Sequence, residues 1–367
     1  MKNFSYNFFT TTATAWEAML EALRTARRSI AWELYALADD QAGRPFIDVL
    51  CAQAQSGLEV KIILDWIGSW SLSRPAEMRL RQAGVDVVWY NRPTSELHPL
   101  RFWRRLFYRN HRKVLVVDGE IAFLGGVNVE QAASAWDDLH VRLSGTAVSP
   151  LQRGFARSYL AAGGQRRAIK HLLQRPWAQG LSGLKNKIQF ILHSPLLPRE
   201  RHRLRQWYRQ AIVQAKKKIT LLSPYYVPDQ ELMELLTAAR ARGVAVEVII
   251  PWRSDHRLMD LLAQHYYTIM ARAGAALYFG DNMNHAKALL VDGMQALVGS
   301  VNATNRSFAF NEEAGIIVSD TAMVRDLSRI VEQWKAKARI FSAATLPPLT
   351  AWRRLAGWAA YALRGIV

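Results

Sequence analysis

The chain of 367 residues contains a single cysteine, Cys51. One cysteine excludes an internal disulfide framework and a cysteine-rich metal site, so a reducing compartment is allowed but not required. No run of about 20 apolar residues is present, and we therefore expect no transmembrane helix. Residues 1–14 lack the continuous apolar stretch of a signal peptide, so we expect no export by that route.

Two other kinds of ligand site are missing from the sequence pattern. No His and Cys residues have zinc spacing, and no glycine-rich loop of the nucleotide-binding kind occurs, so we expect neither a metal nor another cofactor. Acidic residues are also few, because 30 Asp and Glu stand against 48 Lys and Arg, which gives a net charge of +18. This excess favours a polyanionic partner, either nucleic acid or an anionic membrane, over simple solubility.

What the sequence does contain is one motif in two copies. HRKVLVVD at 111–118 and HAKALLVD at 285–292 share the spacing His-x-Lys-x4-Asp. Both copies continue in step, with a glycine seven, an asparagine ten and an acid twenty residues beyond the aspartate. This agreement at many positions argues against chance. The matched residues are His111, Lys113, Asp118, Gly125, Asn128 and Asp138 in the first copy and His285, Lys287, Asp292, Gly299, Asn302 and Glu312 in the second.

The spacing within each copy suits an anionic substrate. Residues two apart share one face of a strand, so His111 and Lys113 are expected to project together from a strand whose next residues are apolar. The Lys offers a fixed positive charge. The His, with an ordinary pKa of roughly 6.5, can attack as neutral imidazole or donate a proton as imidazolium near neutral pH.

The rest of the chain is also duplicated. Strand patterns at 29–36, 58–65 and 84–90 alternate with helical ones, which predicts an α/β fold with mixed, largely parallel sheets. ARRSI returns as AKKKI, and GLEVKIILD returns as GVAVEVIIP. We therefore predict two duplicated α/β/α lobes, a pseudo-two-fold axis and one active site between the lobes. The expected domains are a first lobe at 1–175, a second lobe at 176–345 and a basic, aromatic tail at 346–367.

The paired segments HRKVLVVDGEIAFLGGVNV and HAKALLVDGMQALVGSVNATNRSFAFNEE resemble the HKD motifs of the phospholipase D superfamily. Within it the chain is most similar to bacterial cardiolipin synthases, also at IAWELYALADDQAG, GLEVKIILDWIGS, WDDLHVRLSG and SPYYVPDQEL. The resemblance implies transfer of a phosphatidyl group between two phosphatidylglycerol molecules, with release of glycerol. No nucleotide is expected, because a covalent intermediate retains the energy of the broken bond.

Such a reaction needs both charge neutralisation and a nucleophile. The anionic oxygens of a phosphodiester repel nucleophiles, so the site must bind them and split the displacement into easier steps. The resemblance makes His111 the nucleophile that forms a phosphohistidine and His285 the general acid and base, although the symmetry of the motif leaves the opposite assignment open. The residues expected to bind the phosphoryl oxygens are Lys113, Lys287, Asn128, Asn302 and Ser300.

The acids of the two copies are expected to play supporting roles. Asp138 and Glu312 each follow a motif His by 27 residues. They resemble the family acids that hold an imidazole by its other nitrogen and so fix its tautomer. Asp118 and Asp292 complete the catalytic motif, and we expect them to support the strand and loop structure around the site rather than to touch the substrate.

The acceptor molecule separates the functions that remain open. Water as the acceptor makes the protein a phospholipase D hydrolase, and a nucleic-acid substrate makes it a phosphodiesterase or nuclease that fits the same motif and charge. A third hypothesis is a membrane-binding protein without catalytic activity. The intact sets of His, Lys and Asn residues argue against it. Glu33, a charged residue in an apolar strand, is expected either near the active site or on an edge strand.

Access to lipid is expected to be peripheral, at the cytoplasmic face of the bacterial inner membrane. RFWRRLFYRN at 101–110 and WRRLAGWAAYALRGIV at 352–367 combine basic and aromatic residues, which suits an anionic membrane surface. The alternative for the first is a solvated basic loop, and for the second a terminal helix docked on the protein. The sequence leaves the oligomeric state open.

Overall fold

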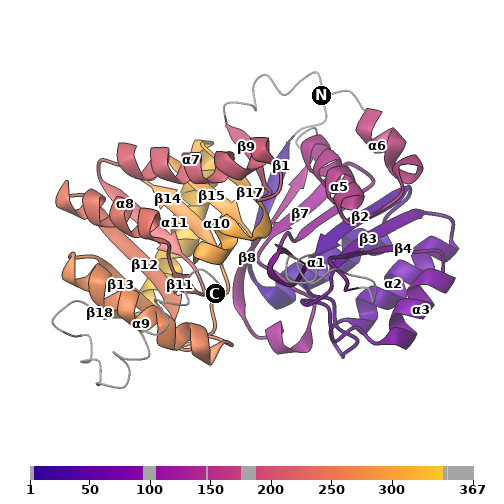
Figure 1. Ribbon diagram of the computed structural model, residues 1–367, viewed down its shortest axis with the longest axis horizontal. Helices are drawn as coiled ribbons and strands as arrows, with labels where there is room; N and C mark the ends of the chain where they lie inside the picture. The colour runs from indigo at the N-terminus through magenta and orange to yellow at the C-terminus, as the bar shows by residue number, and fades with distance from the viewer. Residues whose placement is uncertain (1–3, 94–104, 146–147, 175–186, 342–344, 346–367) are drawn as a thin grey trace. The chain divides into compact units, whose positions relative to one another are not determined.

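The computed structural model of this chain describes residues 4–93, 105–145, 148–174, 187–341 and 345 (Figure 1). The chain divides into two compact units. Each unit contains a three-residue segment from the other half of the sequence. The first unit comprises Met1–Ala135, Leu139–Asn186 and Glu312–Ala314, and the second comprises Trp136–Asp138, Lys187–Asn311 and Gly315–Val367.

The first unit is built on a seven-stranded mixed sheet of order β1-β8-β7-β6-β2-β3-β4. Strands β2, β3 and β4 are parallel to one another. The pairs β2–β6, β6–β7 and β7–β8 are antiparallel. The prediction of an α/β fold with mixed sheets is therefore confirmed. The strands are β1 (Ser5–Thr11), β2 (Ser29–Leu34), β3 (Glu59–Asp65), β4 (Asp86–Tyr90), β6 (Val114–Val117), β7 (Ile121–Gly125) and β8 (Asp137–Ser144).

Helices cover both faces of this sheet. Alternate residues of β2 point to opposite sides, so Ile30, Trp32 and Leu34 pack into a core with α1, α2 and α3. Glu33 points to the other side, where α5 packs against β2 and β6. The helical segments are α1 (Thr12–Arg24), α2 (Arg44–Gln55), α3 (Arg74–Gln82), the 3-10 turn η1 (Gln131–Ala133), α5 (Ser149–Ala161), the 3-10 turn η3 (Arg166–Ile169) and α6 (Lys170–Gln174).

The second unit repeats the same strand plan, with β10, β12, β13, β14, β15 and β17 in the places of β2, β3, β4, β6, β7 and β8. Its strands are β9 (Ile188–His193), β10 (Lys218–Leu222), β11 (Tyr226–Val227), β12 (Ala245–Pro251), β13 (Ala276–Gly280), β14 (Ala288–Val291), β15 (Gln295–Gly299), β16 (Ala303–Thr304), β17 (Asn311–Val318) and β18 (Arg339–Phe341). Its helices are α7 (Pro198–Gln214), α8 (Gln230–Ala241), α9 (Arg257–Arg272), α10 (Asn305–Ala309) and α11 (Thr321–Ala336).

The repeated plan bears out the internal duplication that the sequence predicts. The expected boundary between residues 175 and 176 falls in a stretch, 175–186, that lies outside the described residues. The tail at 346–367 and residues 101–104 of the basic segment also lie outside them. Among the described residues, no helix combines the length and the apolar character needed to cross a bilayer.

Candidate active site

The first motif carries its polar residues just ahead of a strand. His111 and Lys113 lie between β5 (Arg109–Asn110) and β6, which begins at Val114. The alternation of polar and apolar residues predicts that both lie within the strand, whereas in the structure both precede its first residue. The backbone N–H of His111 donates to the carbonyl of Glu312 at 2.9 Å, and the Lys113 ammonium donates to the His111 carbonyl at 3.0 Å. Both side chains are buried.

The imidazole of His111 is held by a carboxylate and an aromatic ring. Its Nδ1 lies 3.1 and 3.2 Å from the two carboxylate oxygens of Glu313. The ring of Tyr35 packs edge-on at 5.1 Å between ring centres, and the Lys113 ammonium lies 5.0 Å from the centre of the same tyrosine ring. A proton held at Nδ1 by the carboxylate makes Nε2 the nitrogen that carries the lone pair.

The second motif repeats this arrangement. Nδ1 of His285 lies 2.9 Å from a carboxylate oxygen of Asp138, and the Lys287 ammonium donates to the His285 carbonyl. The rings of Trp136 and Tyr225 lie 5.1 and 6.2 Å from the imidazole. Each unit therefore contains one buried imidazole with its own carboxylate, ammonium and aromatic neighbours.

Of the two acids expected to hold an imidazole, Asp138 does so and Glu312 does not. Asp138 contacts His285, which belongs to the other copy of the motif, and the acid at His111 is Glu313 rather than Glu312. The spacing of 27 residues between His and acid does not hold in the second half, which has one more residue before the acid that meets an imidazole. Strand register shows this, since Gly125 pairs with His140 but Gly299 pairs with Gly315, so Asp138 corresponds to Glu313.

Sequence reasoning missed Glu313, although a signal was present. Each half has two consecutive acids, Asp137 with Asp138 and Glu312 with Glu313. Neighbouring residues of a strand point to opposite faces, so one acid of each doublet faces the imidazole and the other faces away. The pair of acids locates the residue that contacts the imidazole to within one position, and the register of the strand determines which of the two it is.

Glu312 instead belongs to a buried ionic network around Arg112. The Arg112 guanidinium lies 2.8 Å from the Glu312 carboxylate and 3.9 Å from that of Glu33, and its Nε donates to the carbonyl of Glu313 at 3.1 Å. Burial raises the pKa of Glu33, and the charge of Arg112 opposes that rise. Because β2 lies between β6 and β3, the edge-strand alternative for Glu33 is wrong.

The aspartate of each motif supports the hairpin that follows it. Asp118 and Asp292 have positive φ angles of 55° and 54° and are each followed by a glycine at 66°, the pattern of a tight type I′ turn. The Asp118 carboxylate accepts the backbone N–H groups of Arg27, Arg28 and Ser29 at 2.7–3.2 Å, which fixes the start of β2.

Asp292 does the same for β10 by accepting the backbone N–H groups of residues 216–218, each at 2.8 Å. Burial by itself raises the pKa of Asp292, but these three donors outweigh it and hold the pKa below its ordinary value. Both aspartates therefore contact backbone donors at the start of a strand, as expected for a supporting role.

The remaining candidates, Asn128, Asn302 and Ser300, are buried. The side-chain carbonyl oxygens of Asn128 and Asn302 find no hydrogen-bond partner among the described residues. A buried amide oxygen without a partner costs free energy, and a bound substrate can supply that partner. The described residues contain no group of three or more His, Cys, Asp and Glu side chains that could hold a metal ion.

Comparison with known proteins places this arrangement in a family. The model described as the PLD-like domain of cardiolipin synthase matches residues 19–157 and 208–335. The chain belongs to this cardiolipin synthase family. The resemblance seen in the two HKD motifs is thereby confirmed.

Curated relatives carry the same name. The minor cardiolipin synthase ClsB of Bacillus subtilis is 30% identical over 355 residues, which cover 95% of this chain and 85% of that protein. Cardiolipin synthase A of Pseudomonas aeruginosa is 33% identical over 326 residues, which cover 87% of this chain and 64% of the relative. The chain thus spans most of the first relative and somewhat less than two thirds of the second.

Solved structures show the same fold at low identity. The phosphatidylserine synthase of Haemophilus influenzae matches with a TM-score of 0.76 at 15% identity, covering 99% of this chain and 95% of that chain. The polyphosphate kinase of Porphyromonas gingivalis matches with a TM-score of 0.60 at 14% identity, covering 98% of this chain and 53% of that one. At these identities the likeness concerns the fold alone.

Proposed function

We propose that this protein is a phosphatidyltransferase that makes cardiolipin from two molecules of phosphatidylglycerol and releases glycerol. One observation carries the proposal: a chain of the cardiolipin synthase family holds two buried imidazoles, each with a carboxylate at Nδ1 and a lysine ammonium two residues on. Two such groups supply the nucleophile and the proton donor that a double displacement at phosphorus needs.

In the proposed first step, Nε2 of His111 attacks the phosphorus of one phosphatidylglycerol. A P–N bond forms, the P–O bond to the glycerol headgroup breaks, and His285 as imidazolium gives its proton to the leaving glycerol oxygen. In the second step, neutral His285 takes the proton from a hydroxyl of the second phosphatidylglycerol, whose oxygen attacks phosphorus and expels His111. This scheme requires the two imidazoles to meet at one site, which is part of the proposal.

The carboxylates make each imidazole fit for its role. Glu313 holds the proton at Nδ1 of His111, which keeps the lone pair on Nε2 for attack. Asp138 stabilises the positive charge that His285 carries while it is protonated. Neither carboxylate needs to leave its imidazole during the cycle.

The lysines and asparagines bind the substrate in this proposal. Lys113 and Lys287 offset the negative charge on the phosphoryl oxygens, which otherwise repels a nucleophile. The unpaired side-chain oxygens of Asn128 and Asn302 accept a hydrogen bond from a glycerol hydroxyl. With the amide turned by 180°, its nitrogen donates to a phosphoryl oxygen instead. Ser300, two residues before Asn302, offers a hydroxyl that the first motif, with Gly126, lacks.

Both substrates are lipids, so the protein must reach a membrane surface. We propose peripheral association with an anionic membrane, on its cytoplasmic face in a bacterium. The net charge of +18 supports this partner, because each basic residue near an anionic surface contributes roughly 1 kcal/mol of attraction.

Lipid analysis tests the proposal directly. The purified chain is incubated with phosphatidylglycerol liposomes without added metal or nucleotide, beside Lys287→Ala and, as a matched control, Lys170→Ala at an exposed position. We expect cardiolipin and glycerol in equal amounts from the wild type and the control, and a loss of about a thousandfold with Lys287→Ala. Phosphatidic acid alone would show that water is the acceptor. No turnover of lipid, with cleavage of a nucleic acid, would replace the proposal by a nuclease.

A further inference from the structure

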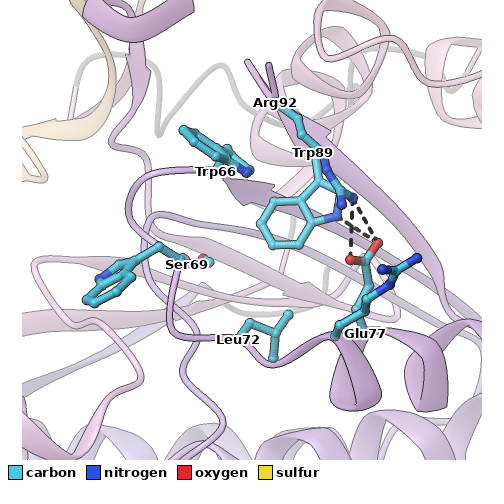
Figure 2. Close-up of a pocket in the computed structure, with 8 residues that line it drawn as sticks. Trp66, Ser69, Leu72, Glu77, Trp89 and Arg92 are labelled. Atoms are coloured by element: carbon cyan, nitrogen blue, oxygen red, sulfur yellow. Dashed lines mark hydrogen bonds and ion pairs between the residues drawn. The ribbon is translucent and has the colours of Figure 1, made fainter. Parts of the chain in front are cut away.

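A pocket walled by indole rings lies in the first unit, at the end of β3 and β4, and its role is not explained by the chemistry at phosphorus. It encloses about 160 Å³. Figure 2 shows Trp66 and Trp89 on its walls, with the carboxylate of Glu77 directed at the Trp89 ring nitrogen. We call it the indole pocket, and the lining residues that matter here are Trp66, Trp70, Trp89, Arg74, Glu77 and Arg92.

The base of the indole pocket is tied to the segment that carries His111. The buried Asp65 carboxylate accepts two N–H groups of the loop at 67–68 and also the N–H of Asn110, the residue before His111, at 2.8 Å. The Ser69 hydroxyl donates to the Tyr35 carbonyl at 3.0 Å, and the Tyr35 ring packs on His111. The loop at 66–72 is therefore linked to the imidazole through Tyr35 and through the residue that precedes His111.

The outer side of the loop is apolar and open. Trp70 is 82% exposed, the largest exposed fraction among the large apolar side chains of the described residues. Met78, on the exposed side of α3, is 51% exposed and lies one helical turn beyond Arg74. Burying a tryptophan is strongly favourable, so one that remains in water at the wall of a pocket with two other indoles indicates an interaction surface.

Cations outnumber anions around the same pocket. Glu77 accepts from the Trp89 ring nitrogen at 2.8 Å and pairs with Arg81 at 2.9 Å and Arg92 at 3.4 Å. The Arg92 guanidinium also lies 5.5 Å from the centre of the Trp89 ring. The guanidinium of Arg74 has no partner among the described residues. Two guanidinium groups therefore share one carboxylate while a third has none, which leaves a local excess of positive charge.

We propose that the indole pocket is the surface with which the first unit docks on an anionic phospholipid bilayer, with Trp70 in the interfacial layer and a lipid phosphate at Arg74 and Arg92. Indoles gather at the level of the lipid headgroups, where one edge is apolar and the other is wet. Guanidinium groups bind phosphate with two parallel hydrogen bonds.

This inference rests on the proposed function, in which both substrates are lipids, and it adds the surface that reaches them. Docking at Trp70 would set the depth of His111 at the headgroups, because Asp65 and Ser69 connect the loop to the imidazole's own support. Indole rings also stack on nucleic-acid bases, so a nucleic acid is the competing occupant that the experiment must separate.

A probe at Trp70 tests the contact without turnover. The chain has one cysteine, the buried Cys51, so Cys51→Ala with Trp70→Cys accepts a polarity-sensitive fluorophore at one place. The same label at Met294→Cys is the matched control, because Met294 is 73% exposed and belongs to the second unit. Adding His111→Ala to both labelled variants prevents turnover, so the lipid composition of the vesicles stays constant. With vesicles of phosphatidylglycerol and phosphatidylcholine we expect a blue shift at position 70 and none at 294.

Affinity measurements test the same residues without a label. By vesicle sedimentation, Trp70→Ala is expected to weaken binding about tenfold and Arg74→Gln about fivefold. The control Arg325→Gln, at an exposed basic residue of α11, is expected to change the affinity by less than about twofold, because a charge outside the docking surface is screened from the lipid headgroups at physiological salt. Trp70→Ala should keep its turnover of short-chain phosphatidylglycerol dispersed as monomers.

Several outcomes would overturn the inference. Vesicle binding with no shift at position 70, equal losses in Arg74→Gln and Arg325→Gln, or an absence of vesicle binding would each do so. A shift with single-stranded oligonucleotide but not with vesicles would assign the pocket to nucleic acid. A shift with vesicles in a chain that makes no cardiolipin would keep the docking surface and reject only the proposed function.

Discussion

Beside His111 a buried guanidinium, Arg112, lies between the carboxylates of Glu33 and Glu312, whereas the residue after His285 is Ala286, whose methyl group carries no charge. The two halves therefore duplicate the imidazole, its carboxylate, its lysine and the backbone hydrogen bond from the His N–H, but not the guanidinium. The difference shows that the reaction constrains the residues that carry out the chemistry, whereas the residues that position them can differ between the halves.

The supports do a comparable task by different means. In the first unit, Arg112 and the His111 backbone bind the segment Glu312–Ala314, which comes from far along the chain. In the second unit, Trp136–Asp138 is held by backbone hydrogen bonds, from Asp137 N–H to the Met283 carbonyl and from His285 N–H to the Asp137 carbonyl. Six variants, in four experiments, test where the halves are equivalent and where they differ.

The largest effect is expected from the imidazoles themselves. His111→Ala and His285→Ala should each lower cardiolipin formation by about 10⁴-fold or more, because nucleophile and proton donor act as a unit. A phosphatidyl ester of p-nitrophenol separates their roles, since this leaving group needs no proton. We expect His285→Ala to release one equivalent of p-nitrophenol in a burst and His111→Ala to release none. A burst from His111→Ala alone would exchange the roles, and His171→Ala serves as the control.

The exchanged acids give the next largest effect. Glu313→Gln should lower kcat about 10² to 10³-fold, because a neutral amide no longer fixes the proton at Nδ1 of His111 or stabilises its charge. Glu312→Gln should leave kcat within about tenfold, since its carboxylate faces Arg112 and not the imidazole. Steady-state rates on phosphatidylglycerol make the comparison. The reverse ranking would return the orienting role to Glu312.

The third experiment tests the guanidinium that only the first half has. Arg112→Met should lower the free energy of unfolding by about 3–5 kcal/mol at pH 7, because it leaves two carboxylates buried without their cation. The pKa of Glu33 is already raised by burial, and losing Arg112 raises it further. The favourable protonated state of Glu33 is fully present below its ordinary pKa of 4.5 and is lost as pH rises through the folded-state pKa.

The defect of Arg112→Met should therefore be small at pH 4 and grow toward pH 7. Urea unfolding at both pH values measures it, with the exposed Arg325→Met as the matched control. A defect that does not change with pH would contradict the role assigned to Glu33. Activity that falls while stability is unchanged would mean that Arg112 acts on the substrate and not on the segment at 312–314.

The smallest effect concerns the aspartates, where the halves are alike. Asp292→Asn should cost about 1–2 kcal/mol at pH 7, as the loss of a charged cap on backbone donors does elsewhere. The pKa of Asp292 is lowered, so its stabilisation is present above the ordinary value of 3.8 and disappears as pH falls through the folded-state pKa. The wild type and Asp292→Asn should converge there, whereas the exposed control Asp281→Asn should differ little at any pH.

Much of this protein could be predicted because its signals are local. The two copies of His-x-Lys-x4-Asp, the alternation of helix and strand patterns and the repeat of AKKKI after ARRSI lie within short windows, where periodicity and spacing act directly. The supporting role of Asp118 also follows locally, because an Asp-Gly pair favours the positive φ angles of a tight hairpin turn.

What only the tertiary structure decided is non-local. Which acid meets which imidazole depends on strand register, since a shift of one residue turns every side chain of a strand to its other face. The single extra residue between Asn302 and the second acid makes that shift, and it replaces Glu312 by Glu313 at His111. The exchange of Asp138 and Glu313 between the halves joins segments that no sequence window contains. The indole pocket lies within residues 66–92, yet only the packing of the loop at 66–72, α3 and β4 brings its side chains together.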